Sequence, residues 1–186
     1  MNVEFTTPFD QKPGTIALLL RQAYADLVKS DPLLWEPEQA NWEQYDCEVF
    51  GRPTSVGACI FLTRLDGRIV GFGSWDPRQR PYFGIVGHNC VLPEFRGRGF
   101  GKQQIQEILR RFREMAIETA KASTNDHPFF IPAQRMYTAC GFREVRRIPW
   151  DRDPRQRMIE YEKEIGQQVG PRDGVPAAGD PNVRRH

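Results

Sequence analysis

The chain has 186 residues, of which 39% are hydrophobic and 27% charged, and its formal net charge is +2. This composition is ordinary for one soluble globular domain, and apolar runs of only a few residues exclude a membrane-spanning helix. The first residues, MNVEFTTPFDQK, lack the basic and apolar regions of a signal peptide, and the four cysteines form no CxxC pair. We therefore predict a reduced, cytoplasmic protein with neither a disulfide framework nor a metal site.

The first fifty residues predict one short strand and two helices. Residues 2–7 are an expected strand before Pro8. From Gly14, apolar residues recur at the spacing of one helical face, and Asp31-Pro32 ends this helix. A second, acidic helix is expected over 37–50.

The next residues predict a β meander, followed by alternating helices and strands. Asp66-Gly67 lies between two apolar runs, 57–65 and 68–75, which is a β-hairpin signal. The remaining expected elements are a strand at 82–92, a helix at 99–116, a strand at 118–124, a helix at 132–140, and strands at 142–148 and 157–165.

This order predicts a single α/β domain over residues 1–165. Its sheet is expected to be mixed but mostly antiparallel, with seven strands and about four flanking helices. Residues 166–186 lack any periodicity and are predicted to be a disordered tail.

The stretch VLPEFRGRGFG, residues 91–101, places three glycines where a strand leads into a helix. Free N–H groups at a helix start, together with the helix dipole, suit a bound anion such as phosphate. Lys102 is followed by Gln103, which does not fit a Walker A loop, and Lys102 also stands where a Rossmann fingerprint needs its third glycine. A turn that serves packing alone is the alternative.

Two motifs resemble those of the GCN5-related N-acetyltransferase (GNAT) superfamily. VLPEFRGRGFG, with Arg96-x-x-Gly99-x-Gly101, resembles its acetyl-CoA-binding motif, and AQRMYTACGF at 133–142 resembles its downstream motif. The order of elements over residues 3–165 also matches. The resemblance implies a sheet that is splayed between the fourth and fifth strands.

The resemblance also implies that acetyl-CoA is the co-substrate. The turn and the helix start would hold the pyrophosphate, and the end of the fourth strand would pair its backbone with the pantetheine arm. The contact with phosphate is then mostly made by backbone, so changes at Gly99 or Gly101 should weaken binding more than a change at Arg98. The implied binding residues are Cys90, Val91, Leu92, Arg96, Gly97, Arg98, Gly99, Phe100, Gly101 and Lys102.

The implied reaction moves an acetyl group from acetyl-CoA to a primary amine by direct attack in a ternary complex. Tyr137 matches the family's general acid, although a tyrosine there could simply pack on the sheet. A backbone N–H near Val91 is the expected oxyanion donor. The family often places a base or a water-holding group on the fourth strand, where His88 and Asn89 are the candidates. Alternation puts them on opposite faces, so only one can face the acceptor cleft. The weaker candidates for the base are Asp46, Glu48, Asp126 and His127.

The sequence departs from the family pattern at Phe130, where an asparagine is common. Asn125 is the nearest asparagine, and two prolines and two phenylalanines follow it, which predicts a reshaped, more apolar loop. This departure puts the family's usual asparagine contact with pantetheine in doubt.

The acceptor is not fixed by the sequence. Seven acids against Lys29 alone lie between residues 26 and 50, interleaved with aromatic residues, and would suit a cationic amine. A small amine, an amino acid and a protein amine all remain open, and so does the alternative of a solvated acidic helix.

Three other readings are kept beside the acetyltransferase. One is a non-catalytic acyl-CoA-binding module, and another is a transferase with a longer acyl donor. A nucleic-acid binder is disfavoured, because RGRG stands alone in a chain of low net charge. Monomer and homodimer are equally compatible with the sequence.

Overall fold

The computed structural model describes residues 2–166. Its seven strands form one sheet in the order β1-β2-β3-β4-β5-β7-β6, which confirms the predicted α/β fold. All neighbouring strands are antiparallel except β4 and β5. The strands are β1 (Val3–Thr6), β2 (Ile60–Leu65), β3 (Arg68–Asp76), β4 (Phe83–Val91), β5 (Thr119–Asn125), β6 (Arg143–Trp150) and β7 (Asp153–Glu164).

Helices cover both faces of this sheet. The α-helices are α1 (Thr15–Ala23), α2 (Ala25–Ser30), α3 (Pro32–Trp35), α4 (Glu38–Gly51), α5 (Phe100–Glu114) and α6 (Ile131–Ala139). Short 3-10 turns are η1 (Pro8–Asp10), η2 (Gly57–Cys59), η3 (Pro93–Phe95) and η4 (Pro128–Phe130). Among residues 2–166, no helix is long and apolar enough to cross a membrane.

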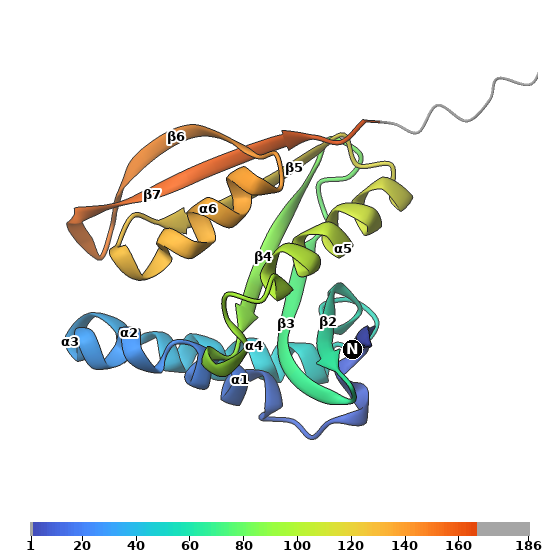
Figure 1. Ribbon diagram of the computed structural model, residues 1–186, viewed down its shortest axis with the longest axis horizontal. Coiled ribbons are helices and arrows are strands. Elements are labelled where there is room, and N and C mark those ends of the chain that lie inside the picture. The colour runs from blue at the N-terminus through green and yellow to red at the C-terminus, as the bar shows by residue number, and fades with distance from the viewer. Residues whose placement is uncertain (1, 167–186) are drawn as a thin grey trace, which may run out of the picture.

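The parallel pair β4–β5 is short, and the two strands then separate. Only Phe83–Ile85 pair with Thr119–Lys121. Beyond this point the sheet opens into a V, with β4 on one arm and β5, β7 and β6 on the other (Figure 1). The backbone on that edge of β4, from residue 86 onward, therefore has no strand partner in the described chain.

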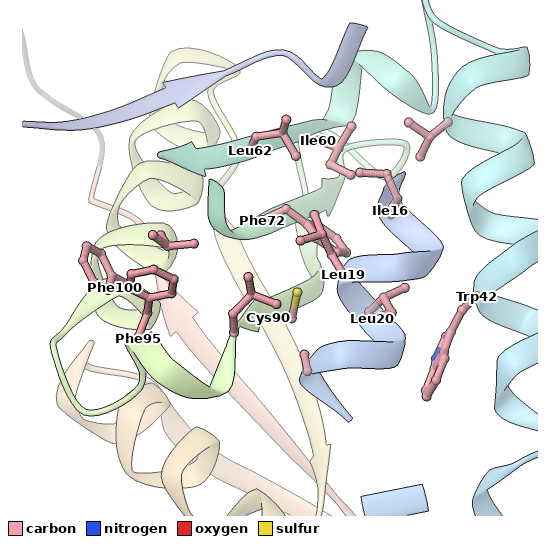
Figure 2. Close-up of a cluster of buried hydrophobic side chains, with 14 of the residues drawn as sticks. Ile16, Leu19, Leu20, Trp42, Ile60, Leu62, Phe72, Cys90, Phe95 and Phe100 are labelled. Atoms are coloured by element: carbon pink, nitrogen blue, oxygen red, sulfur yellow. The ribbon is translucent and has the colours of Figure 1, made fainter. Parts of the chain in front are cut away.

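Two buried clusters, one on each face, hold the helices to the sheet. Figure 2 shows the first, in which Leu19 and Leu20 of α1 approach Phe72 of β3 and Cys90 of β4. The second cluster joins α5 and α6 to the strands through residues such as Ile108. Burial of aliphatic and aromatic side chains supplies most of the stabilisation of both contacts.

Helix α1 starts where α4 provides a carboxylate. Asp46 of α4 is 3% exposed and accepts hydrogen bonds from the N–H groups of Gly14 (2.6 Å), Ile16 (2.8 Å) and Ala17 (3.2 Å). These amides have no partner within the helix, so Asp46 caps α1 from outside it. The cap fixes α1 against α4 on one face of the sheet.

The structure differs from the predicted elements in several places. Helix α3 is not among the predicted elements, and residues 57–59 form the turn η2 where the expected strand 57–65 would begin. The single helix expected from Gly14 to Asp31 is broken at Tyr24, and at this break the carbonyl of Ala23 accepts a hydrogen bond from the Arg96 guanidinium. The last hairpin is longer than predicted, since β6 runs on through Pro149 to Trp150. An edge strand tolerates proline, which lacks an N–H but loses no ladder bond on the solvent side.

All four cysteines are free thiols. Cys47 is exposed on α4, whereas Cys90 is buried on β4. The predicted tail, 166–186, lies outside the described residues except for its first residue.

Candidate active site

The N-terminus of α5 is open toward the V of the sheet. Gly99 is its N-cap residue with φ +84°, and no side chain caps the helix. Gly97 also has a positive φ of +71°, a conformation that costs little only for glycine. The first amides of α5 therefore have no side-chain cap, which is the geometry that a bound anion would need.

Two buried aromatic side chains anchor this turn. Phe95 precedes it and Phe100 follows it, and they are 6% and 4% exposed. Their rings meet edge-to-face with centroids 6.3 Å apart (Figure 2). The exposed Arg98 lies over both rings, at 5.7 Å from Phe95 and 5.4 Å from Phe100. The two buried rings thus fix the turn on its inner side, while its backbone faces solvent.

Arg96 joins three parts of the molecule. Its Nε donates to the carbonyl of Val91 at 3.2 Å, and its Nη2 donates to the carbonyl of Ala23. The guanidinium also lies 5.4 Å from the ring centroid of Phe129. Arg96 therefore braces the end of β4 against α1 and against the loop before α6.

A cavity of about 410 Å³ runs from this turn into the V. Gly97, Gly99 and Lys102 border it at the α5 end. Tyr24 also lines it, together with Phe129 of η4 and Met136 of α6. One space therefore connects the uncapped start of α5 to the end of β4 and to the segment of η4 and α6 opposite it.

Most of the residues predicted to hold a cofactor line this cavity. The lining includes Cys90, Val91, Arg96, Gly97, Gly99, Phe100, Gly101 and Lys102. Leu92 and Arg98 are not in the lining. Leu92 is 7% exposed in the first core cluster, and its N–H donates to the carbonyl of Val70 at 2.9 Å.

His88 and Asn89 face opposite sides of the sheet, as strand alternation predicts. The imidazole of His88 lies against the ring of Tyr45 on α4, with centroids 4.9 Å apart. Desolvation by the surrounding protein lowers the pKa of His88, which keeps the imidazole neutral at pH 7. Asn89 lines the cavity under the start of α5.

The weaker candidates for a base are largely occupied. Asp46 caps α1, and Asp126 Oδ1 accepts from the N–H of Arg157 at 2.9 Å. His127 Nδ1 accepts from the N–H of Phe129 at 3.2 Å. Their acceptor atoms thus stabilise local backbone.

Tyr137 is buried on α6 between other aromatic rings. It is 5% exposed, and its ring centroid lies 5.5 Å from that of Phe142 and 5.4 Å from that of Tyr161. Burial raises the pKa of Tyr137, so the phenol stays protonated and can act as a donor. It is not among the cavity-lining residues.

A second tyrosine, Tyr24, lies in the cavity wall and was not singled out from the sequence. It occupies the break between α1 and α2 and stacks on Trp42 at 5.4 Å. Burial raises the pKa of Tyr24 as well. Helical periodicity marks Tyr24 only as a core residue, and its ring contacts with Phe129 and Phe130 are not visible in the sequence.

Aromatic contacts close the far side of the V. Phe130 lies 5.8 Å from Trp35 of α3, which stacks on Trp150 of β6 at 5.0 Å. An ion pair between Glu38 and Arg152 lies beside them. The predicted apolar loop therefore connects the two arms of the sheet.

Several of the acids expected to attract a cationic acceptor have partners within the protein. Glu38 pairs with Arg152, and Glu43 pairs with Arg21. Asp31 accepts from the N–H of Leu34 at 3.3 Å, at the start of α3. Their charge is thus partly compensated locally.

An uncapped helix start, a splayed β4–β5 pair and a cavity beside the end of β4 are the arrangement expected of a transferase that uses an acyl-CoA donor. A model of the acetyltransferase (GNAT) family matches residues 20–142. The chain belongs to this family and is an N-acetyltransferase with acetyl-CoA as its co-substrate.

Solved structures agree on the fold. An N-acetyltransferase from Staphylococcus aureus is 16% identical, with a TM-score of 0.64 over 89% of this chain and 100% of its own. A protein from Desulfovibrio desulfuricans described as a GNAT-family acetyltransferase is 16% identical, with a TM-score of 0.66 over 89% and 99%. YncA from Salmonella typhimurium, solved with acetyl-CoA, is 13% identical, with a TM-score of 0.61 over 94% and 99%. No curated protein sequence matches the chain.

Proposed function

We propose that this protein transfers the acetyl group of acetyl-CoA directly to a primary amine in a ternary complex. The observation that carries the proposal is the cavity at the start of α5, which lies between the end of β4 and the segment of η4 and α6 that follows β5. The first amides of α5 and Lys102 would hold the pyrophosphate, and the open edge of β4 would pair with the pantetheine arm.

The acceptor amine must be neutral before it can attack the thioester carbonyl. His88 is the proposed base, because its pKa is lowered and it lies on the α4 side of β4, away from the donor cavity. The C–N bond forms as the amine proton passes to His88. A backbone N–H near Val91 would stabilise the oxyanion.

The C–S bond then breaks, and the leaving thiolate needs a proton. Tyr137 is the proposed donor, since burial keeps its phenol protonated. Tyr24 is the competing donor because it lines the cavity. Paired variants of the two tyrosines decide between them.

The protonation state of the Cys90 thiol favours direct attack by the amine over a route through an acetyl-cysteine intermediate. Cys90 lines the cavity, but burial raises its pKa to about 12. A thiol that stays protonated is a poor nucleophile, so an acetyl-cysteine intermediate is disfavoured. This argues for direct transfer to the amine.

Calorimetric titration with acetyl-CoA tests the proposal, with Gly99→Glu as the control. We expect micromolar binding that the control abolishes. A non-glycine residue at φ +84° strains the turn, and the glutamate carboxylate repels phosphate. A folded wild-type protein that binds no acetyl-CoA would overturn it. Release of CoA thiol in a screen of small amines, amino acids and peptides then identifies the acceptor class.

Two further parts of the proposal concern partners and location. The acceptor is a small-molecule or peptide amine, and we retain the prediction of a cytoplasmic protein. Sedimentation of the purified chain distinguishes monomer from homodimer.

A further inference from the structure

Asn89 carries a carboxamide whose nitrogen is not used by the described part of the protein. Its Nδ2 is buried and has no hydrogen-bond partner among the described residues. Its neighbours around the cavity include the apolar side chains of Val91 and Met136. A buried amide without a partner destabilises a folded protein, so its presence calls for a role.

The cavity is left open next to this carboxamide by a glycine. A Cβ on Gly101 would lie 2.8 Å from Met136 Sδ and 3.8 Å from Asn89 Oδ1. The absence of a side chain at position 101 therefore leaves a narrow passage between α5, α6 and β4. Asn89 is on the β4 wall of that passage.

The chemistry of the carboxamide suits a particular kind of ligand group. A half-turn about the Cβ–Cγ bond exchanges Oδ1 and Nδ2, so Asn89 can offer the cavity either an acceptor or a donor. A secondary amide presents the complementary groups, one N–H and one C=O. The arm of an acyl-CoA carries such amides, whereas its nucleotide half carries charges that the start of α5 would hold.

We propose that Asn89 is a binding residue for an amide of the acyl-donor arm, and not a base. This inference rests on the proposed function, because it needs acetyl-CoA in the cavity. Asn89 fixes how far the arm enters the V, and hence where the thioester stops relative to His88. Asn89 would also give the arm a polar contact in a chain that has Phe130 where the family commonly has an asparagine.

The test compares two ligands on an Asn89→Leu variant, in which the amide is replaced by an apolar group of similar volume. We expect the Kd of acetyl-CoA to rise about tenfold, as for the loss of one hydrogen bond in a closed site. The Kd of the nucleotide half of CoA, prepared without the arm, is expected to stay unchanged. Asn89→Ala repeats the comparison if the leucine variant does not fold.

Thermal unfolding of the ligand-free variant supplies a second readout. We expect Asn89→Leu to raise Tm by about 2–4 °C, since it removes an unpartnered amide. Asn125→Leu is the matched control, because Asn125 Oδ1 accepts from the N–H of His127 at 2.7 Å. That substitution should lower Tm.

Three outcomes would overturn the inference. Equal weakening of both ligands would show that Asn89 only shapes the cavity, and a fall in Tm would show that its amide stabilises the fold. An unchanged Kd for acetyl-CoA would show that the arm does not reach Asn89. If the wild type binds neither ligand, the proposed function fails first, and the two failures are thereby distinguished.

Discussion

At the scale of single residues, substitutions at the turn before α5 distinguish the contribution of the backbone to acetyl-CoA binding from that of an exposed charge. Gly101→Ala places a methyl group 2.8 Å from Met136 Sδ, inside the passage beside Asn89. We expect the Kd of acetyl-CoA to rise about tenfold. Arg98→Ala removes an exposed charge and should change the Kd only about two- to fivefold. Calorimetry checks the order, and a larger effect at Arg98 would contradict the backbone grip.

The two buried tyrosines make a matched pair. Tyr137→Phe is expected to lower kcat by about 10²- to 10⁴-fold with little change in KM, because only proton donation is lost. Tyr24→Phe should lower kcat less than about threefold if Tyr24 is only part of the wall. Steady-state rates with an amine found by the screen decide the assignment. The reverse order would move the donor from α6 to the break between α1 and α2.

The lowered pKa of His88 predicts a pH dependence with a defined sign. The native protein binds fewer protons than the unfolded chain at pH values between the lowered pKa and about 6.5. Stability should therefore fall as pH falls through this interval, and activity should fall with it as the base is protonated. His88→Gln is expected to lower kcat and to flatten both profiles. Urea unfolding and rates measured from pH 4 to pH 8 provide the check, and unchanged profiles in the variant would remove His88 from the mechanism.

Most residues that line the candidate donor cavity at the start of α5 could be named from the sequence, but those of its opposite wall could not. The glycines before α5 form a local motif whose φ angles and spacing depend only on neighbours in the chain. Tyr24 and Phe129 enter the wall through Arg96, which contacts residues far from it in sequence. A single sequence carries no direct signal of such contacts.

At the scale of elements, α1 depends on a carboxylate from α4. Asp46→Ala removes the acceptor of three backbone N–H groups, two of them buried, and should lower the free energy of unfolding by about 2 kcal/mol. Urea denaturation measures this loss, and acetyl-CoA binding should persist in the folded variant because Asp46 does not line the cavity. A stable variant that has lost all transfer activity would instead make Asp46 the base.

The order and type of the strands and longer helices follow from periodicity and turn residues. The hairpin at Asp66-Gly67 forms as predicted, with positive φ at both residues. The break at Tyr24 and the extension of β6 through Pro149 could not be predicted, because each depends on a neighbour supplied by tertiary structure. One is the guanidinium of Arg96, and the other is the solvent edge of the sheet.

At the scale of the whole molecule, the two arms of the sheet share little backbone pairing. Within residues 2–166, β4 and β5 are joined over only three register pairs, and aromatic side chains such as Trp35 and Trp150 bridge the far side. A donor bound in the V would contact both arms at once. The free energy of unfolding of the whole molecule is therefore expected to increase when acetyl-CoA is bound.

Hydrogen exchange and thermal unfolding with acetyl-CoA check this expectation. At about 100 times the Kd, mass action adds about 2.7 kcal/mol, or about 5–10 °C in Tm. Exchange should slow at the end of β4, in the first turn of α5 and around Phe129, and should stay unchanged in β1. Uniform slowing across the chain, or slowing in β1 alone, would contradict a donor site in the V. Gly99→Glu provides the control without a bound donor.

The free thiol of Cys47 on α4 has a practical consequence for enzymology. Every catalytic cycle releases a thiol, so turnover is naturally followed with a chromogenic disulfide reagent. That reagent will also modify Cys47, which is exposed, whereas the buried thiol of Cys90 is shielded. The enzyme itself therefore gives a rapid initial rise in absorbance that is proportional to its concentration. Replacing Cys47 with serine lowers this background and leaves the V of the sheet unchanged.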